Sequence, residues 1–151
     1  MRAQPPAPHR PPPLAAGPVG PVVLYDGDCG VCQRVADGLS MRHGPEVAVW
    51  RPWQGEPSLP AGLTQERLER EIVMVEPGGA LIGGHRVFAR VLRRTRGWRA
   101  LGLLIALPGP SLLARLIYRL FAARRRWLSL RLGLNACRLP RRIEPHHKEN
   151  R

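Results

Sequence analysis

The chain has 151 residues, of which 44% are hydrophobic, and a formal net charge of +13. This length suits one domain with its own hydrophobic core and excludes a large multidomain enzyme. Three cysteines and the lack of an apolar leader segment point to a reducing, cytoplasmic compartment and exclude a secreted scaffold stapled by disulfides.

The two ends of the chain differ in composition from the part between them. Proline is frequent in the first 21 residues, which contain no apolar run, and the last residues are mostly charged or polar. We therefore predict a disordered proline-rich arm over residues 1–21, one folded domain over residues 22–140, and a polar tail over residues 141–151.

An apolar run at residues 22–25 leads into a short acidic turn and then into Cys29 and Cys32. The run predicts a buried parallel strand, and Gly27 and Gly30 permit the tight turn that must follow it. The next residues predict a helix with Cys29 in its first turn and Cys32 one turn later. At this spacing the two sulfur atoms can close a small disulfide ring.

This placement predicts different roles for the two cysteines. Backbone N–H groups and the positive end of the helix dipole stabilise a thiolate, so Cys29 is the predicted attacking sulfur. Cys32 lies further inside the helix, where we expect it to be less exposed and to resolve the mixed disulfide. Asp28 is a candidate auxiliary residue, because its carboxylate raises the pKa of Cys29 unless it turns away to cap the helix.

The remaining elements follow from periodicity and from turn residues. We predict a strand at residues 46–50, a loop at 51–62, and a short helix from an N-cap at Thr64 to about residue 70. A hairpin then joins strands at 72–75 and 80–82 through Pro77-Gly78-Gly79. Three helices complete the chain: one after His85, one at 98–107, and one from residue 111 to about 132.

Two further side chains have both a functional and a structural interpretation. Trp53 in the predicted loop is either a substrate platform beside the cysteines or a ring that covers an edge of the core, and we favour the second. His85 is either a proton relay for the thiols or a solvated residue at a helix start, and again we favour the second.

Asp26, Cys29 and Cys32 match the Asp-x-x-Cys-x-x-Cys motif that gives the DCC family of thiol–disulfide oxidoreductases its name. The chain resembles this family over residues 22–140, through Pro52-Trp53-Gln54, Gly62-Leu63-Thr64, Gly97-Trp98-Arg99, residues 118–126 and Cys137-Arg138-Leu139-Pro140. The resemblance implies a thioredoxin-like domain of bacterial type that exchanges electrons with a protein or small-molecule disulfide or dithiol. We expect no bound cofactor.

The predicted order of elements agrees with this resemblance. It reads β-α-β-α-β-β-α, the α/β core of the thioredoxin or glutaredoxin fold, with added C-terminal helices. One difference from thioredoxin is that no proline precedes the strand near Ile72, where thioredoxin holds a cis-proline against its cysteines. Within the motif, Asp26 is a candidate catalytic residue that orients the turn and accepts the proton of Cys32.

Cys137 is a candidate auxiliary thiol near the end of the predicted domain. It is either a second resolving group or a thiol packed against the core without redox work, and we favour the packed thiol.

Two other chemistries compete for the same motif. Cys29, Cys32 and Cys137 could bind zinc together with His146 or His147, although a structural zinc site usually has a second close-spaced pair. The Asp-x-Asp sequence at residues 26–28 also looks like a phosphatase motif. We disfavour that function because phosphoryl transfer needs a cation, and the only lysine lies in the polar tail.

Positive charge is concentrated in the second half of the chain. No acidic residue lies between Glu76 and Glu144, whereas fifteen arginines do. Such a charge distribution would attract nucleic acid or an anionic membrane surface, but we favour arginine as a simple solubilising residue. The alternative function is therefore a non-catalytic basic zinc module that contacts nucleic acid or anionic membrane.

No apolar run reaches the ~20 residues of a transmembrane helix, although a helix lying on a membrane surface remains an alternative.

Overall fold

The computed structural model describes residues 20–134. The proline-rich arm up to residue 19 and the whole polar tail lie outside this range, as do Cys137, His146 and His147. A four-stranded sheet in the order β2-β1-β3-β4 forms its centre. The strands are β1 (Val22–Tyr25), β2 (Val49–Pro52), β3 (Val73–Val75) and β4 (Leu81–Gly83).

The sheet is mixed. β1 pairs in parallel with β2, with Val23 opposite Trp50, and antiparallel with β3, with Val23 opposite Met74. β3 and β4 form the predicted antiparallel hairpin. The parallel pair needs a crossover connection, which contains helix α1 (Gly30–Ser40). Because β1 is central and has neighbours on both sides, its carboxyl end, where the cysteine motif begins, is held in place by the sheet.

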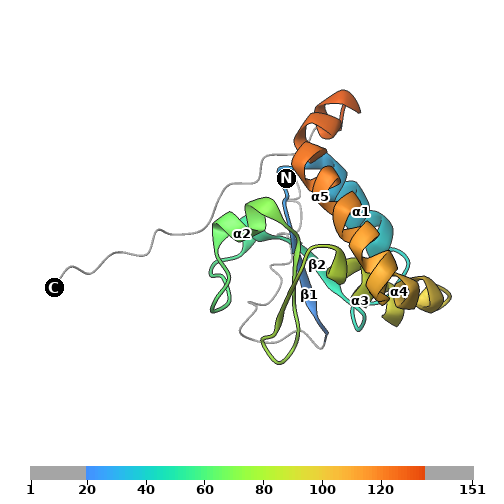
Figure 1. Cartoon of the computed structure of the whole chain (residues 1–151). Coiled ribbons are helices and arrows are strands. Elements are labelled where there is room, and N and C mark those ends of the chain that lie inside the picture. Colours follow the sequence, from blue (N-terminus) through green and yellow to red (C-terminus); the bar gives the residue numbers. More distant parts are fainter. Residues whose placement is uncertain (1–19, 135–151) are drawn as a thin grey trace, which may run out of the picture.

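Four further helices surround the sheet: α2 (Gln65–Arg70), α3 (His85–Arg94), α4 (Arg99–Ala106) and α5 (Pro108–Arg131). In Figure 1, α2 lies on one side of the sheet and α3, α4 and α5 lie on the other, with α5 running beside α1. The axes of α4 and α5 are bent by 92° relative to each other. No single helix among residues 20–134 is long and apolar enough to cross a membrane, and only the bent α4–α5 pair has the required length and composition when taken together.

The core has one cluster on each face of the sheet. Val22 and Leu24 of β1 pack with Leu68 of α2 on one face, whereas Val23 packs with Val87 and Val91 of α3 on the other. This alternation is what a central strand buried on both faces requires. The two clusters fix α2 and α3 on opposite sides of β1.

The structure confirms the predicted thioredoxin-like α/β fold, including the hairpin and the N-cap at Thr64, whose side chain accepts the Arg67 N–H. The prediction was wrong at the second strand, which starts at Val49 and runs through Pro52 into a 3-10 turn, η2 (Trp53–Gly55). Pro52 fits there because β2 is an edge strand. Likewise, α5 begins at Pro108, since proline suits the first turn of a helix.

Candidate active site

Cys29 is the N-cap of α1. Its backbone is extended, with φ −109° and ψ 105°, and its Sγ accepts a hydrogen bond from the Cys32 N–H at 3.3 Å. The cap of this helix is therefore the sulfur itself, whereas Asp28 has an exposed side chain and does not occupy the cap position. A sulfur at this position meets the unpaired N–H groups of the first turn, which favours the thiolate.

The two thiols have opposite pKa shifts. The pKa of Cys29 is lowered to about 7, first by a hydrogen bond with the Cys32 side chain and further by the Cys32 backbone N–H and by the charge of Arg125. Burial and Asp26 oppose this shift. The pKa of Cys32 is raised, first by its side-chain hydrogen bond with Cys29 and then by burial. Near neutral pH Cys29 is therefore partly ionised, whereas Cys32 stays protonated.

The exposures of the two cysteines are the reverse of those expected. Cys29 is 1% exposed, whereas Cys32 is partly exposed, so the prediction that Cys32 is the less accessible sulfur was wrong. The chain after α5 returns to this end of α1, where a side chain at Gly30 would meet the backbone carbonyl of Leu134. Two hydrogen bonds between Ser129 and Leu134 hold this return, one from the hydroxyl and one to the carbonyl of Ser129, both at 3.0 Å.

Asp26 lies at the end of β1 and is only 3% exposed. Its Oδ1 accepts hydrogen bonds from the Asp28 N–H at 3.0 Å and from Gln54 Nε2 at 2.8 Å. Its Oδ2 accepts no hydrogen bond from residues 20–134 but lies 3.1 Å from Arg125 Nη2. One oxygen therefore fixes the turn before Cys29, and the other is paired with a buried cation.

Two glutamine side chains hold the backbone of Gly27 in the same turn. The fully buried Gln54 accepts the Gly27 N–H at 2.9 Å through Oε1, and Gln33 donates to the Gly27 carbonyl at 2.7 Å. Because Gln54 also donates to Asp26, its amide connects the carboxylate to the glycine turn. The chain that carries the thiols is thus fixed from η2 as well as from α1.

Arg125 brings α5 to this site. Its side chain is only 6% exposed, and its Nη2 also donates to the carbonyl of Glu69 at the end of α2. About two turns earlier on the same helix, the Tyr118 hydroxyl accepts the Ile72 N–H at 2.9 Å. A proline at position 72 would lack this N–H, so the position that thioredoxin fills near its cis-proline is here tied to α5.

Sequence reasoning missed Gln54 and Arg125 as site residues. Gln54 stood within a segment that resembles the DCC family, but nothing in its neighbourhood showed that its side chain turns toward Asp26. Arg125 was one of many arginines. A signal for it did exist, since polar residues recur on α5 at the spacing of one helix face: Ser111, Arg115, Tyr118, Arg125 and Ser129.

The other candidate residues lie apart from the thiols or inside the core. Trp53 is 1% exposed and packs in the core cluster with Leu24 and Leu68, as the structural interpretation expected. His85 begins α3, and its Nε2 lies 3.1 Å from Ser111 Oγ. The pKa of His85 is lowered, first by burial and then by Arg86 and Arg115.

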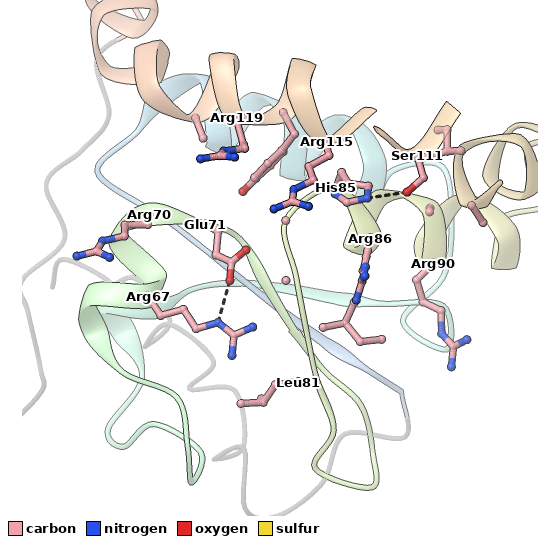
Figure 2. Close-up of a pocket in the computed structure, with 18 of the residues that line it drawn as sticks. Arg67, Arg70, Glu71, Leu81, His85, Arg86, Arg90, Ser111, Arg115 and Arg119 are labelled. Atoms are coloured by element: carbon pink, nitrogen blue, oxygen red, sulfur yellow. Dashed lines mark hydrogen bonds and ion pairs between the residues drawn. The ribbon is translucent and has the colours of Figure 1, made fainter. Parts of the chain in front are cut away.

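His85 lines a cavity of about 1350 Å³ bounded by α2, β4, α3 and α5. Figure 2 shows arginines around this cavity: Arg67, Arg70, Arg86, Arg90, Arg115 and Arg119. Arg67 is paired with Glu71, whereas Arg86, Arg115 and Arg119 make no ion pair with residues 20–134. The lining includes neither cysteine nor Asp26, so the cavity is separate from the thiol pair.

The described part of the chain does not contain a complete set of metal ligands at the cysteine motif. Among residues 20–134, no three His, Cys, Asp or Glu side chains are grouped so that they could hold a metal ion. The remaining ligands of the zinc alternative, Cys137, His146 and His147, lie outside that range.

The geometry is that of a dithiol whose N-terminal sulfur is activated by a helix start, a buried arginine and a second thiol. No curated protein and no solved structure is significantly similar to the chain. The family model of the DCC1-like thiol-disulfide oxidoreductases matches residues 23–131, which include the cysteine pair, all of α5 and every strand residue except Val22. The chain therefore belongs to the DCC1-like thiol-disulfide oxidoreductase family.

Proposed function

We propose that the protein is a dithiol–disulfide oxidoreductase in which Cys29 attacks and Cys32 resolves. The position of Cys29 Sγ at the N-cap of α1, with a pKa of about 7, supports this assignment most strongly. Near neutral pH about half of Cys29 is thiolate, whereas the raised pKa of Cys32 keeps that group protonated. Only thiolates attack disulfides, so we expect the ionised Cys29 to react first although Cys32 is more exposed.

In the reducing direction, the Cys29 thiolate attacks one sulfur of a substrate disulfide. A bond forms between Cys29 and that sulfur, and the other substrate sulfur leaves as a thiolate and takes up a proton. Cys32 then loses its proton and attacks the Cys29 sulfur, which releases the second substrate thiolate. The substrate gains two electrons, and the protein is left with a Cys29–Cys32 disulfide. The reverse sequence oxidises a substrate dithiol.

Asp26 and Arg125 have complementary effects in this scheme. Arg125 stabilises the Cys29 thiolate before attack, because its charge lowers the pKa of both cysteines. Asp26 raises the pKa of both thiols, and we assign acceptance of the Cys32 proton to its Oδ2, which is paired with Arg125 but accepts no hydrogen bond from residues 20–134. We assign Asp26 to the resolving step and Arg125 to the attacking step.

Substrate must reach a sulfur that is almost fully buried. Residues 133 and 134 lie against Gly30 at the start of α1, and the Ser129 hydrogen bonds that hold them are few and near the helix end. Displacement of this short segment would expose the start of α1. We assign it to the substrate-binding step.

Trapping of a mixed disulfide tests the assignment. With a disulfide substrate such as insulin with its disulfides intact or the aromatic disulfide dithiobis(nitrobenzoate), Cys32→Ser should accumulate a covalent adduct on Cys29, because attack proceeds and resolution cannot. Cys29→Ser should form no adduct and lose turnover, whereas Cys137→Ser serves as a control and should keep it. Full turnover of Cys29→Ser, or purification with one bound zinc and no titratable thiol pair, would contradict the proposal.

A further inference from the structure

Helix α5 contacts the rest of the domain through its polar face and exposes its apolar face, which is the reverse of the usual arrangement in a surface helix. The side chains that make specific contacts with the rest of the fold are mostly polar, from Ser111 with His85, through Tyr118 with the Ile72 N–H, to Arg125 with Asp26. These three positions on α5 follow one another at about two helical turns and therefore share one face. A surface helix normally turns its apolar face inward, so the contacts of α5 place its polar face toward the domain.

The opposite face of α5 is apolar and exposed. Leu112, Leu113, Leu116, Ile117 and Leu120, here named the outer face, are each 53% to 68% exposed. At 100° per residue they lie on the side of the helix away from the polar contacts. Leu103 and Leu104 of α4 and Leu107 between the two helices continue this exposure, at 46%, 51% and 53%. Single exposed leucines need no explanation, but a grouped set of this size marks an interaction surface.

We propose that the outer face of α5, together with α4, docks on the surface of an anionic lipid bilayer. The charges around the face favour an anionic occupant. Arg115, Arg119, Arg124 and Arg126 are all exposed on the same helix, and no acidic residue occurs from residue 77 to residue 134. A helix with an apolar face flanked by arginines lies in the headgroup region with its apolar side chains in the acyl boundary.

The tryptophans fit the same orientation. Trp98, just before α4, is 45% exposed, and Trp127 on α5 is 57% exposed, so one lies at each end of the apolar segment. Tryptophan is enriched at membrane–water interfaces, where its ring is apolar and its N–H is hydrated. The Arg131 guanidinium lies 5.0 Å from the Trp127 ring centroid, which adds a cation beside that ring.

A second copy of the chain suits this face less well. In a symmetric dimer built on α5, each outer face would meet its own equivalent, and the exposed arginines of both copies would approach one another. The described part of α3, α4 and α5 carries no carboxylate that could compensate them. Charge complementarity therefore favours lipid phosphates over self-association.

Vesicle flotation with the full chain tests the proposal. The protein should float with vesicles of equimolar phosphatidylcholine and phosphatidylglycerol and stay at the bottom with phosphatidylcholine alone. The triple variant Leu113→Gln, Leu116→Gln, Leu120→Gln should reduce binding at least about tenfold, because it removes apolar groups that would enter the bilayer. Met41→Gln is the control, since Met41 is 81% exposed but lies outside α4 and α5.

The fold of each variant is checked by circular dichroism and by titration of the Cys29–Cys32 pair, which the outer face does not contact. Equal binding to neutral and anionic vesicles would overturn the anionic assignment. Binding unaffected by the triple variant, or no binding by folded wild-type protein, would overturn the docking surface. A dimer in sedimentation equilibrium that the triple variant abolishes would replace the bilayer with a second copy as the occupant.

Discussion

The carboxylate of Asp26 and the guanidinium of Arg125 lie 3.1 Å apart, with side chains only 3% and 6% exposed. This ion pair connects the end of β1 to helix α5, which starts more than eighty residues later. Since Cys29 follows Asp26 by one short turn, this buried pair sets both the position and the electrostatic environment of the thiolate.

Replacing Arg125 with Met should raise the pKa of Cys29 above about 7, because a nearby cation that stabilises the thiolate is lost. We expect the pH dependence of iodoacetamide alkylation to move to higher pH, because the thiolate then forms at higher pH. The free energy of unfolding should fall by about 3–5 kcal/mol, since a buried carboxylate is left without its cation. Arg124→Met is the matched control: Arg124 is exposed on the same helix, and its loss should change neither quantity appreciably. An unchanged alkylation profile in Arg125→Met would contradict the role given to this arginine.

The roles of these two residues show what the sequence could reveal. The thioredoxin-like fold and the dithiol followed from local signals: an apolar strand, a glycine turn, and cysteines one helical turn apart. Asp26 was found because it stands in the motif. Arg125 was not, because only the polar helix face that it shares with Tyr118 and Ser129 distinguishes it from the arginines that face water. The close approach of Leu134 to Gly30 at the start of α1 joins residues more than a hundred positions apart, and no local pattern encodes such a contact.

Asp26→Asn should slow resolution more than attack. The substitution keeps an oxygen for the Asp28 N–H but removes the group proposed to accept the Cys32 proton. Attack should not slow, because Asp26 raises the pKa of Cys29 and its neutralisation favours the thiolate. Stopped-flow kinetics with a chromogenic disulfide separate the two phases. If neither phase changes, Asp26 has no part in proton transfer.

Gly30→Ala should increase access to Cys29. A methyl group at this position would meet the Leu134 carbonyl, so residues 133 and 134 must move away from the start of α1. We expect a several-fold faster alkylation of Cys29 at a pH where the thiolate is fully formed. Gly38→Ala, on the same helix, is the control: its methyl group would meet only the Arg42 side chain at 3.6 Å, and the change should stabilise the helix by ~0.5–1 kcal/mol. Equal alkylation rates in both variants would show that the segment does not limit access.

Mild oxidation should link Cys29 to Cys32 and leave Cys137 free. Cys137 lies outside the described residues, but only three positions after Leu134, so the chain can place it at most roughly 11 Å from that residue. The distance of Cys137 from Leu134 therefore does not decide its role. Peptide mass spectrometry of the oxidised protein identifies which cysteines are linked. A dominant Cys32–Cys137 bridge would instead identify Cys137 as a second resolving thiol.

The most direct test of the central claim is which cysteine reacts first. Brief treatment of the reduced protein with substoichiometric iodoacetamide near pH 7, followed by peptide mass spectrometry, compares Cys29 and Cys32 in one sample. Exposure alone predicts Cys32, because Cys29 is 1% exposed. The pKa values predict Cys29, whose thiolate is present at pH 7 while Cys32 remains protonated. Predominant labelling of Cys29, rising with pH through about 7, is the result we expect, and predominant labelling of Cys32 would contradict the assignment of Cys29 as the attacking sulfur.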